Sequence, residues 1–253
     1  MILFALYNSK GGVGKTTSAV NLAYLASRDG FKTLLWDLDP QGASTFYLNM
    51  TASDNGHLKN WLEDPTHFEG QIQTTAFPNL WHIPANIKNR NADIDLKSAE
   101  KTRQAFKVFK GILKEKFDYV FVDCPPTMSQ LAHHIFRAAH YILIPVIPTT
   151  LSVRTFEQIV DYFDKKELDI RKLIPFFTLV DQRKQMHRQT MERFREAFPK
   201  VLRSTIPTAS EIEKMGLQQA PVYTFSPDSR GSLAYRNLWQ ELKWFKKLKT
   251  PVR

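Results

Sequence analysis

The stretch Ser9-Lys10-Gly11-Gly12-Val13-Gly14-Lys15-Thr16-Thr17 stands between a short apolar run, Ile2–Tyr7, and an amphipathic stretch, Thr16–Arg28. Such apolar runs are typical of buried parallel strands, and apolar residues three and four positions apart are typical of helices. A glycine-rich turn between a strand and a helix gathers backbone N–H groups at a helix N-terminus, where they bind phosphate oxygens. The stretch therefore predicts a phosphate-binding loop within an α/β fold.

The side chains of this loop suggest a bound nucleotide with a magnesium ion. Lys15 is expected to reach the β- and γ-phosphates, and the Thr16 hydroxyl to bind Mg²⁺. Ser9 stands where the general G-x-x-x-x-G-K-[ST] pattern has its first glycine, and Lys10 is an extra lysine inside the loop. The residues expected to contact the nucleotide are Lys10, Gly11, Gly12, Val13, Gly14, Lys15, Thr16 and Thr17.

Strand-like and helix-like patterns alternate along the rest of the chain. Strands are expected at Thr33–Trp36, Leu80–Ile83, Tyr119–Asp123, Tyr141–Ile147, Ile174–Val180 and Val201–Thr205, and helices at Ala105–Leu113, Leu131–Ala139, Ser152–Phe163, Met186–Phe198 and Ser232–Leu248. Ser152 is the expected N-cap of its helix. Residues 49–101 are polar and irregular, and we expect them to wrap the sheet edge.

This alternation predicts a mostly parallel, twisted sheet with helices on both faces. We expect one P-loop ATPase domain over residues 1–253.

Acidic residues follow two of the expected strands. The segment Asp37-Leu38-Asp39-Pro40-Gln41-Gly42 follows the second strand, and Asp123 ends the run that begins at Tyr119. Ligands of open α/β sheets bind at the carboxyl ends of the strands, so both acids are expected near the phosphate loop. Asp123 is the candidate for holding Mg²⁺ directly or through water, and Asp39 for positioning the attacking water.

Composition narrows the classes of partner. The 253 residues carry 35 Lys and Arg against 25 Asp and Glu, a formal charge of +10. Residues 1–126 hold 14 basic and 13 acidic residues, whereas residues 127–253 hold 21 and 12, so a surface for an anionic partner is expected in the second half. Cys124 is the single cysteine, which excludes an internal disulfide. With no secretory signal and no transmembrane run, a cytoplasmic location is expected.

Three motifs in this order resemble the ParA/MinD family of deviant-Walker ATPases, and in particular its short Soj-like ParA partition proteins. They are Lys10–Thr17, Asp37–Gly42 and Val122-Asp-Cys-Pro-Pro126, with further matches at Ile144–Val146 and Ala220–Gly231. The resemblance runs nearly end to end. It implies a catalytic set of Lys10, Lys15 and Asp39, with Thr16 and Asp123 at the metal.

The resemblance also implies a dimer that depends on ATP. Lys10 would reach the ATP of the partner subunit, and Pro207 would contact the adenine. Thr208 and Ala209 stand where related partition proteins commonly have Arg and Asn. The Asn contact to the base and the Arg contact to DNA therefore do not carry over.

ParA-like members bind DNA without sequence preference, whereas MinD-like members bind membranes through an amphipathic tail. Residues 183–203 are rich in basic side chains, which suit salt-sensitive phosphate contacts. Arg183, Lys184 and Arg188 are the first candidates for DNA binding. We favour a nucleoid-associated protein that positions a plasmid, a chromosome region or a protein cargo, with hydrolysis stimulated by a ParB-like partner.

Rival interpretations remain open on the sequence alone. Leu238, Leu242, Phe245 and Leu248 share a helical face, which fits either a MinD-like interfacial helix or a closing helix packed on the domain. A metabolic P-loop ligase or kinase is a further alternative. A reductase related to the nitrogenase iron protein is rejected, because a single Cys124 cannot supply the ligands of an iron–sulfur cluster.

Overall fold

The computed structural model describes residues 1–51, 58–86 and 99–247, and within them all strands join one eight-stranded sheet. The strand order is β3-β4-β2-β5-β1-β6-β7-β8. The strands are β1 Ile2–Leu6, β2 Thr33–Asp37, β3 Gln73–Thr74, β4 Leu80–Ile83, β5 Tyr119–Asp123, β6 Tyr141–Val146, β7 Leu173–Val180 and β8 Thr205–Pro207. Every pairing is parallel except the one between β3 and β4, which confirms the predicted mostly parallel sheet.

Both faces of this sheet are buried. In β1, Leu3 and Ala5 belong to one apolar cluster, whereas Ile2, Phe4 and Leu6 belong to another. The alternation follows from the period of two in a strand, which sends successive side chains to opposite faces. Continuous apolar runs are therefore needed in the sheet, as the sequence predicts for a parallel sheet covered on both sides.

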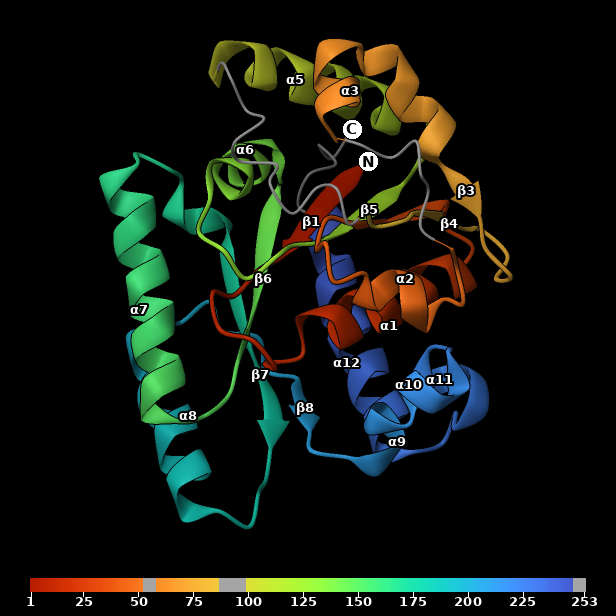
Figure 1. The fold of residues 1–253 in the computed structure, drawn as a ribbon. Helices are drawn as coiled ribbons and strands as arrows, with labels where there is room; N and C mark the ends of the chain where they lie inside the picture. Colours follow the sequence, from red (N-terminus) through yellow and green to blue (C-terminus); the bar gives the residue numbers. More distant parts are fainter. Residues whose placement is uncertain (52–57, 87–98, 248–253) are drawn as a thin grey trace.

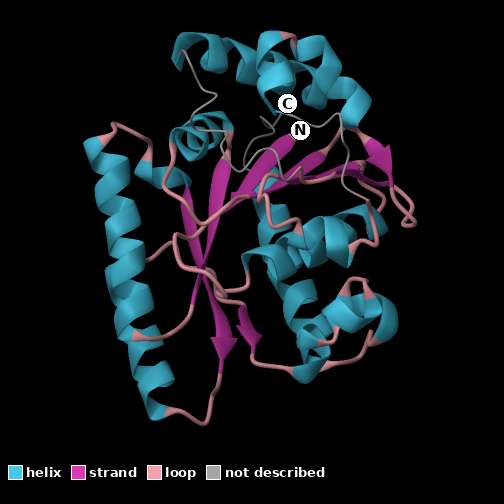
Figure 2. Ribbon diagram, viewed as in Figure 1, coloured by secondary structure: helices cyan, strands magenta, loops and turns pink. Residues whose placement is uncertain are grey.

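The helices form two layers around the sheet (Figures 1 and 2). Side chains of α5 Ala99–Lys116, α6 Gln130–Ala138, α7 Thr150–Lys165 and α8 Gln185–Ala197 pack in the cluster that contains Leu3. Side chains of α1 Lys15–Arg28 and α12 Arg230–Lys247 pack in the cluster that contains Phe4. The described residues also form the short helices α2 Ala43–Tyr47, α9 Ser210–Glu213, α10 Met215–Gln218 and α11 Val222–Phe225.

The region expected to be irregular contains more structure than the sequence indicated. Helix α3 Leu58–Glu63 and the 3₁₀ helix Pro65–Gln71 pack against α5, and β3 adds an antiparallel edge to the sheet. Trp61 and Phe68 are buried beside Trp36 of β2. The expectation that this region wraps the sheet edge is met by β3, and the strand expected at Leu80–Ile83 is confirmed as β4.

The N-cap expected at Ser152 is wrong. Helix α7 begins at Thr150, and its N-cap is Thr149, whose backbone is extended. Ser152 lies inside the first turn, where it is fully buried and accepts a hydrogen bond from the Thr149 hydroxyl at 3.2 Å. Thr150 and the exposed Leu151 give no sign of the helix in the apolar pattern, because they do not face the sheet.

The last strand is displaced from its expected position. Residues 201–204 are outside β8, and the strand begins at Thr205. The backbone N–H groups of Arg203 and Ser204 donate to the Glu241 carboxylate, at 2.7 and 2.9 Å. These N–H groups are thus taken by α12 and do not join the ladder with β7.

The last helix packs on the domain. Tyr235, Leu238, Trp239 and Leu242 of α12 are buried in the cluster that α1 shares. The Trp239 indole N–H donates to Asp29 at 2.9 Å, which fixes the helix against the end of α1. This confirms the closing-helix interpretation for these residues, while Leu248 and the side chain of Phe245 lie outside the described part. On the described residues, none of the helices has the length and apolar character needed to cross a membrane.

Candidate functional site

The phosphate loop joins β1 to α1 at the carboxyl edge of the sheet. Gly12 and Gly14 adopt left-handed backbone conformations, with φ of 70° and 87°. Side chains other than glycine are strained there. Gly14 is the N-cap of α1, so the loop ends where the unpaired N–H groups of the helix begin.

Two side chains that the sequence analysis did not single out hold this loop in place. Asn8 is fully buried; its amide donates to the Pro145 carbonyl at 2.8 Å, and its Oδ1 accepts from the Lys10 N–H at 2.9 Å. Thr178 of β7 donates its hydroxyl to the Val13 carbonyl at 2.8 Å. The sequence contains a signal that could have identified Thr178, because it is the one hydroxyl residue in the otherwise apolar run of β7.

Lys15 and the predicted acids come together. The Lys15 ammonium is largely buried and donates to the Lys10 carbonyl at 3.2 Å. Burial lowers the pKa of Lys15, and the charges of Asp123 and Asp39 oppose that shift. The two acids are thus close enough to act on the lysine electrostatically, as predicted from their positions at strand ends.

Asp123 is a buried carboxylate without a hydrogen-bond partner in the described part of the chain. It is fully buried, and neither carboxylate oxygen makes a hydrogen bond of normal geometry there. Burial raises its pKa well above the usual range, and the nearby charge of Asp37 adds to the rise. The Thr16 hydroxyl is close enough to lower this pKa, although no regular hydrogen bond joins the two groups.

This arrangement fits a hydrated magnesium ion. A buried carboxylate without a donor can accept hydrogen bonds from waters of the metal, and a threonine hydroxyl is a suitable oxygen ligand. Among the residues that the structure describes, no three His, Cys, Asp or Glu side chains cluster as metal ligands. A metal at Thr16 and Asp123 would therefore share its ligands with bound phosphate. Cys124 is buried, as expected.

Asp37 lies beside Asp123 but has different surroundings. Its Oδ2 accepts from the Thr45 N–H at 2.9 Å and from the Thr45 hydroxyl at 2.7 Å. Its Oδ1 accepts from the Asp39 N–H at 3.2 Å. Burial raises the pKa of Asp37 to about 6 despite the opposing bonds from Thr45. The carboxylate therefore anchors the segment that carries Asp39.

His82 of β4 extends this anchor into the sheet. The Thr45 hydroxyl also contacts His82 Nε2 at 3.1 Å, and His82 Nδ1 lies 2.9 Å from the Leu35 carbonyl. Burial lowers the pKa of His82 to about 4, so the ring is neutral at pH 7. The sequence pattern assigns no role to this lone histidine.

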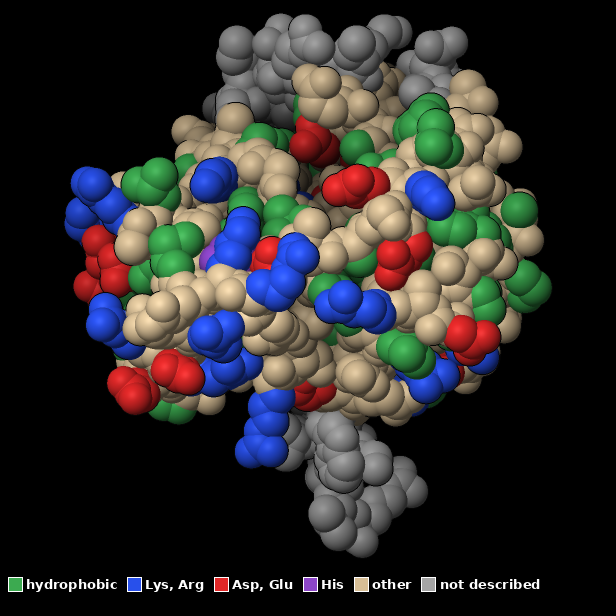
Figure 3. Space-filling view, turned by 90° about the horizontal axis from the view of Figure 1, so that it is seen from below, with side chains coloured by type: hydrophobic (Ala, Val, Ile, Leu, Met, Phe, Trp, Pro, Cys, Tyr) green, Lys and Arg blue, Asp and Glu red, His purple; other side chains and the backbone are tan. Residues whose placement is uncertain are grey.

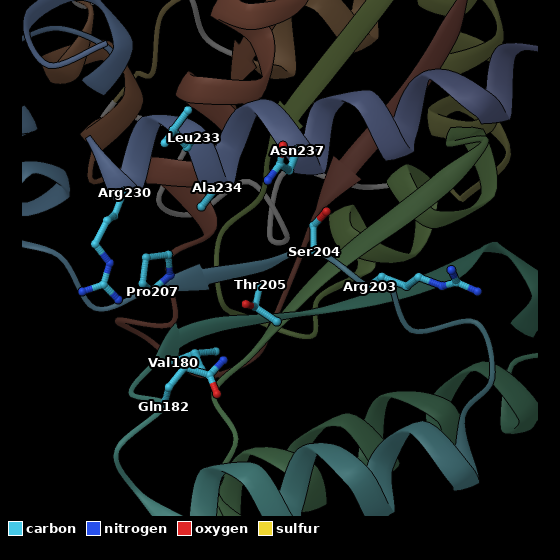
Figure 4. A pocket seen from close by; sticks show the side chains of 10 residues that line it. All are labelled: Val180, Gln182, Arg203, Ser204, Thr205, Pro207, Arg230, Leu233, Ala234 and Asn237. Atoms are coloured by element: carbon cyan, nitrogen blue, oxygen red, sulfur yellow. The ribbon is translucent and has the colours of Figure 1, made fainter. Parts of the chain in front are cut away.

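The ends of β7 and β8 carry two further pockets. Pro207 pairs with Val180, and the Thr208 N–H donates to the Val180 carbonyl at 3.1 Å. A cavity of about 290 Å³ is lined by residues at the ends of both strands, including Asp181 and Thr208, and by Arg230 of α12. A second cavity of about 450 Å³ lies between β8 and α12, with Arg203 and Arg230 at opposite ends (Figure 4). Pro207 lines the larger of these two pockets, and the next residue, Thr208, lines the smaller one.

Of the three residues suggested for DNA binding, Arg183 and Lys184 lie between β7 and α8, and Arg188 lies in the first turn of α8. Arg183 forms a two-pronged ion pair with Asp181, both N–O distances being 3.0 Å, and this pairing lowers the pKa of Asp181 to about 2. Arg188 donates to the Gln182 carbonyl at 2.6 Å, and Lys184 precedes the first turn of α8. Figure 3 shows several Lys and Arg side chains gathered on this lower side of the molecule. Because Asp181 pairs with Arg183, the positive charge of Arg183 is balanced by a neighbouring carboxylate.

A family model described as an AAA domain matches residues 1–176, which is more than half of the chain. The chain belongs to this family, as a P-loop ATPase of the ParA/MinD type. The sporulation initiation inhibitor protein Soj of Bacillus subtilis is 29% identical over 246 residues, which cover 95% of this chain and 97% of Soj. The resemblance drawn from the three motifs is confirmed.

Solved structures support the same ParA/MinD fold. A plasmid partition protein of Borrelia burgdorferi bound to AMPPNP has a TM-score of 0.80 at 21% identity, with coverage of 97% of this chain and 99% of that one. The septum site-determining protein MinD of Pyrococcus horikoshii, complexed with Mg-ADP, has a TM-score of 0.79 at 20% identity and 99% coverage of both chains. At these identities the likeness concerns the fold.

Proposed function

We propose that this ParA/MinD-type ATPase is a nucleotide switch. It binds ATP and Mg²⁺, pairs with a second copy, binds DNA without sequence preference in that state, and leaves the DNA after hydrolysis. The observation that carries this proposal is the buried, unpartnered carboxylate of Asp123 beside Lys15 and Thr16. Burying an ionised carboxylate without partners is costly, and a bound metal with its waters would supply the missing partners.

Each residue around the phosphates has a role in this proposal. The backbone N–H groups of Gly11, Gly12, Val13 and Gly14, with Thr17 at the helix start, would bind phosphate oxygens. Lys15 would neutralise the β- and γ-phosphates, and Thr16 and Asp123 would hold the metal with its waters. Magnesium supplies charge neutralisation when bound. Asp39 would orient the attacking water, and Pro207 would border the adenine.

Two observations support pairing with a second copy across this edge. Lys10 lies in the loop beside Lys15 and forms no ion pair within the described part of the chain, as expected of a lysine that serves a partner's phosphate. Among the exposed large apolar side chains of the described part, five follow the carboxyl ends of strands: Phe46, Met128, Leu151, Met186 and Leu217. A second copy would cover this apolar surface.

Basic residues of the second half support DNA as the anionic partner. Lys184 is the N-cap of α8 and Arg188 lies in its first turn, and Arg203 and Arg230 border the pocket beside β8. Because Arg183 is paired with Asp181, we expect it to contribute less than Arg188. Contacts of this kind are to phosphate and carry no sequence information. We infer a nucleoid-associated, cytoplasmic protein that segregates a plasmid, chromosome region or protein cargo with a ParB-like adaptor.

The decisive experiment measures DNA binding with ATP, ADP or no nucleotide, each at several salt concentrations. We expect binding with ATP only, falling steeply as salt rises. Asp39→Ala should keep ATP-dependent DNA binding but lose hydrolysis, whereas Lys10→Ala should lose ATP-dependent pairing. Equal DNA binding in all three nucleotide states would refute the switch.

A MinD-like membrane function is the alternative, and the burial of Leu238, Trp239 and Leu242 disfavours it. Those side chains would have to leave the core to enter a lipid interface. Binding to anionic vesicles but not to DNA would favour this alternative. Nucleotide-dependent turnover of a small-molecule substrate would instead favour a metabolic ligase or kinase.

A further inference from the structure

A large basic pocket lies on helices that do not take part in the nucleotide site. Its volume is about 750 Å³, and it lies among the start of α5, the whole of α6 and the end of α7. These segments come together at the upper left of Figure 1, away from the loop between β1 and α1. The lining residues are Glu100, Arg103, Met128, Ser129, Gln130, His133, His134, Arg137, Tyr162, Lys165, Lys166 and Glu167.

The hydrogen bonds among the residues that line this pocket leave the Tyr162 hydroxyl able to donate to a ligand. Arg137 Nε donates to His133 Nε2 at 2.9 Å, so this nitrogen carries no proton and the neutral ring has its proton on Nδ1. His133 Nδ1 lies 3.5 Å from the Tyr162 hydroxyl, which accepts this proton. The hydroxyl's own hydrogen is thus available to a ligand in the pocket.

The charges of the pocket point the same way. Four cations and two carboxylates line it, and Glu100 is already bonded to Arg103 at 2.8 Å. Lys165 and Lys166, in the last turn and at the C-cap of α7, are exposed. Burial, together with the charges of Arg137 and Lys166, lowers the pKa of His133, which indicates a positive potential at the ring. The pocket therefore offers positive charge and hydrogen-bond donors to an acceptor-rich ligand.

The pocket is also close in sequence to the proposed metal site. Met128, Ser129 and Gln130 line it, and only residues 124–127 separate Met128 from Asp123. Ser129 caps α6 by accepting from the Ala132 N–H at 3.2 Å. A ligand that presses on this cap would act on the short loop that follows Asp123.

We propose that this pocket is the docking site for an acidic segment of a partner protein. A groove bordered by three helices, open to solvent and lined with dispersed cations, complements a chain with several carboxylates. This inference rests on the proposed partner-stimulated cycle for its role in hydrolysis, but the binding itself is independent of that cycle.

The test uses the full chain with saturating ADP and Mg²⁺, so that the phosphate loop is filled. The probe is a fluorescent peptide of eight glutamates, and the variants are Lys165→Gln/Lys166→Gln and Tyr162→Phe. We expect Kd to rise about tenfold for the double variant and about threefold for Tyr162→Phe. The matched control is Lys32→Gln/Lys114→Gln, which removes the same charge from exposed lysines outside the pocket and should change Kd less than twofold.

A second readout reports on the pocket alone. Peptide binding should raise the pKa of His133, followed through its ring protons by NMR, because carboxylates favour the charged imidazole. An equal loss of affinity in the control pair, or an unchanged His133 pKa, would refute the site. Inorganic tripolyphosphate that displaces the peptide and binds more tightly would show a small-anion site instead of a peptide groove. None of these results depends on nucleotide-dependent DNA binding, so the two proposals can fail separately.

Discussion

Asp37 and Asp123 are neighbours in the sheet with opposite surroundings. They end β2 and β5, face each other in the strand register, and are both almost completely buried. Asp37 accepts three hydrogen bonds from the segment that follows it, whereas Asp123 has no regular hydrogen bond in the described part of the chain. The same residue type at equivalent positions thus serves structure in one case and is left open for a ligand in the other.

Hydrogen bonding therefore distinguishes the structural Asp37 from the functional candidate Asp123, whereas burial does not. Both groups have a raised pKa, with burial as the main cause. Only the absence of partners marks Asp123 as a group that waits for a metal or water. Four predictions test this difference.

The largest effect is expected from Asp123→Asn. ATP hydrolysis should fall on the order of 100-fold or more, because the metal's waters lose a charged acceptor. Stability to urea should stay unchanged or rise, because a buried charge without a partner is removed. Asp37→Asn should affect stability more than hydrolysis, with a loss of about 1–3 kcal/mol in unfolding free energy. Parallel effects of the two variants on stability and turnover would break the comparison.

The next largest effect concerns the pH dependence of the unfolding free energy, to which His82 contributes. Its folded pKa of about 4 lies below the ordinary value of 6.5, so its stabilising contribution is complete above pH 6.5 and is lost as pH falls toward 4. His82→Gln should remove this dependence, which amounts to about 3 kcal/mol over that range. Urea unfolding at pH 7, 5.5 and 4 measures the unfolding free energy over this range. His67→Gln, on an exposed side chain, is the control and should keep the wild-type pH dependence.

A smaller effect is expected from Thr45→Val. The hydroxyl contacts Asp37, His82 and the Ala85 N–H, so its removal should lower the unfolding free energy by about 2 kcal/mol. Thr45→Ser keeps the hydroxyl and should lose less than about 1 kcal/mol. If the two variants were equally unstable, packing of the methyl group rather than the hydroxyl would support Asp37.

The smallest effect is expected from Thr178→Val, which removes a single hydrogen bond to the phosphate loop. Stability should fall by about 1 kcal/mol, and the Kd of ATP should rise less than tenfold. Thr178→Ser serves as the control. A loss of stability larger than that of Thr45→Val would mean that the loop, and not the Asp37 anchor, is the more tightly held region.

The long elements of the fold could be predicted because their patterns repeat. The buried strands β1, β5, β6 and β7 are continuous apolar runs, and α8 shows helical spacing. Helix α2 and helices α9 to α11 have five residues or fewer, too few for a period to show. Helix α5 extends beyond the predicted Ala105–Leu113 because the residues added at its two ends are mostly polar and show no apolar period. β8 could not be placed because Glu241, distant in sequence, takes two of its expected N–H donors.

The candidate site divides in the same way. The phosphate loop, Asp39 and Asp123 follow from motifs and strand ends, because the topology alone brings them to one edge. Asn8 and Thr178 hold the loop through contacts to residues more than 130 positions away. The pairing of Arg183 with Asp181 is local but depends on side-chain geometry that a charge count does not contain. Long-range contacts and side-chain orientation were therefore the missing information.

Trp239 has a consequence for how the protein is made. Its indole contacts Tyr119, Phe121 and Phe31 and bonds to Asp29, all in the first half of the chain. On a ribosome, the centre of the sheet and α1 emerge long before α12 does. The part of the sheet that α12 covers therefore stays exposed until synthesis is almost complete. A chain that stalls before residue 230 exposes this apolar surface and is prone to aggregate unless a chaperone binds it.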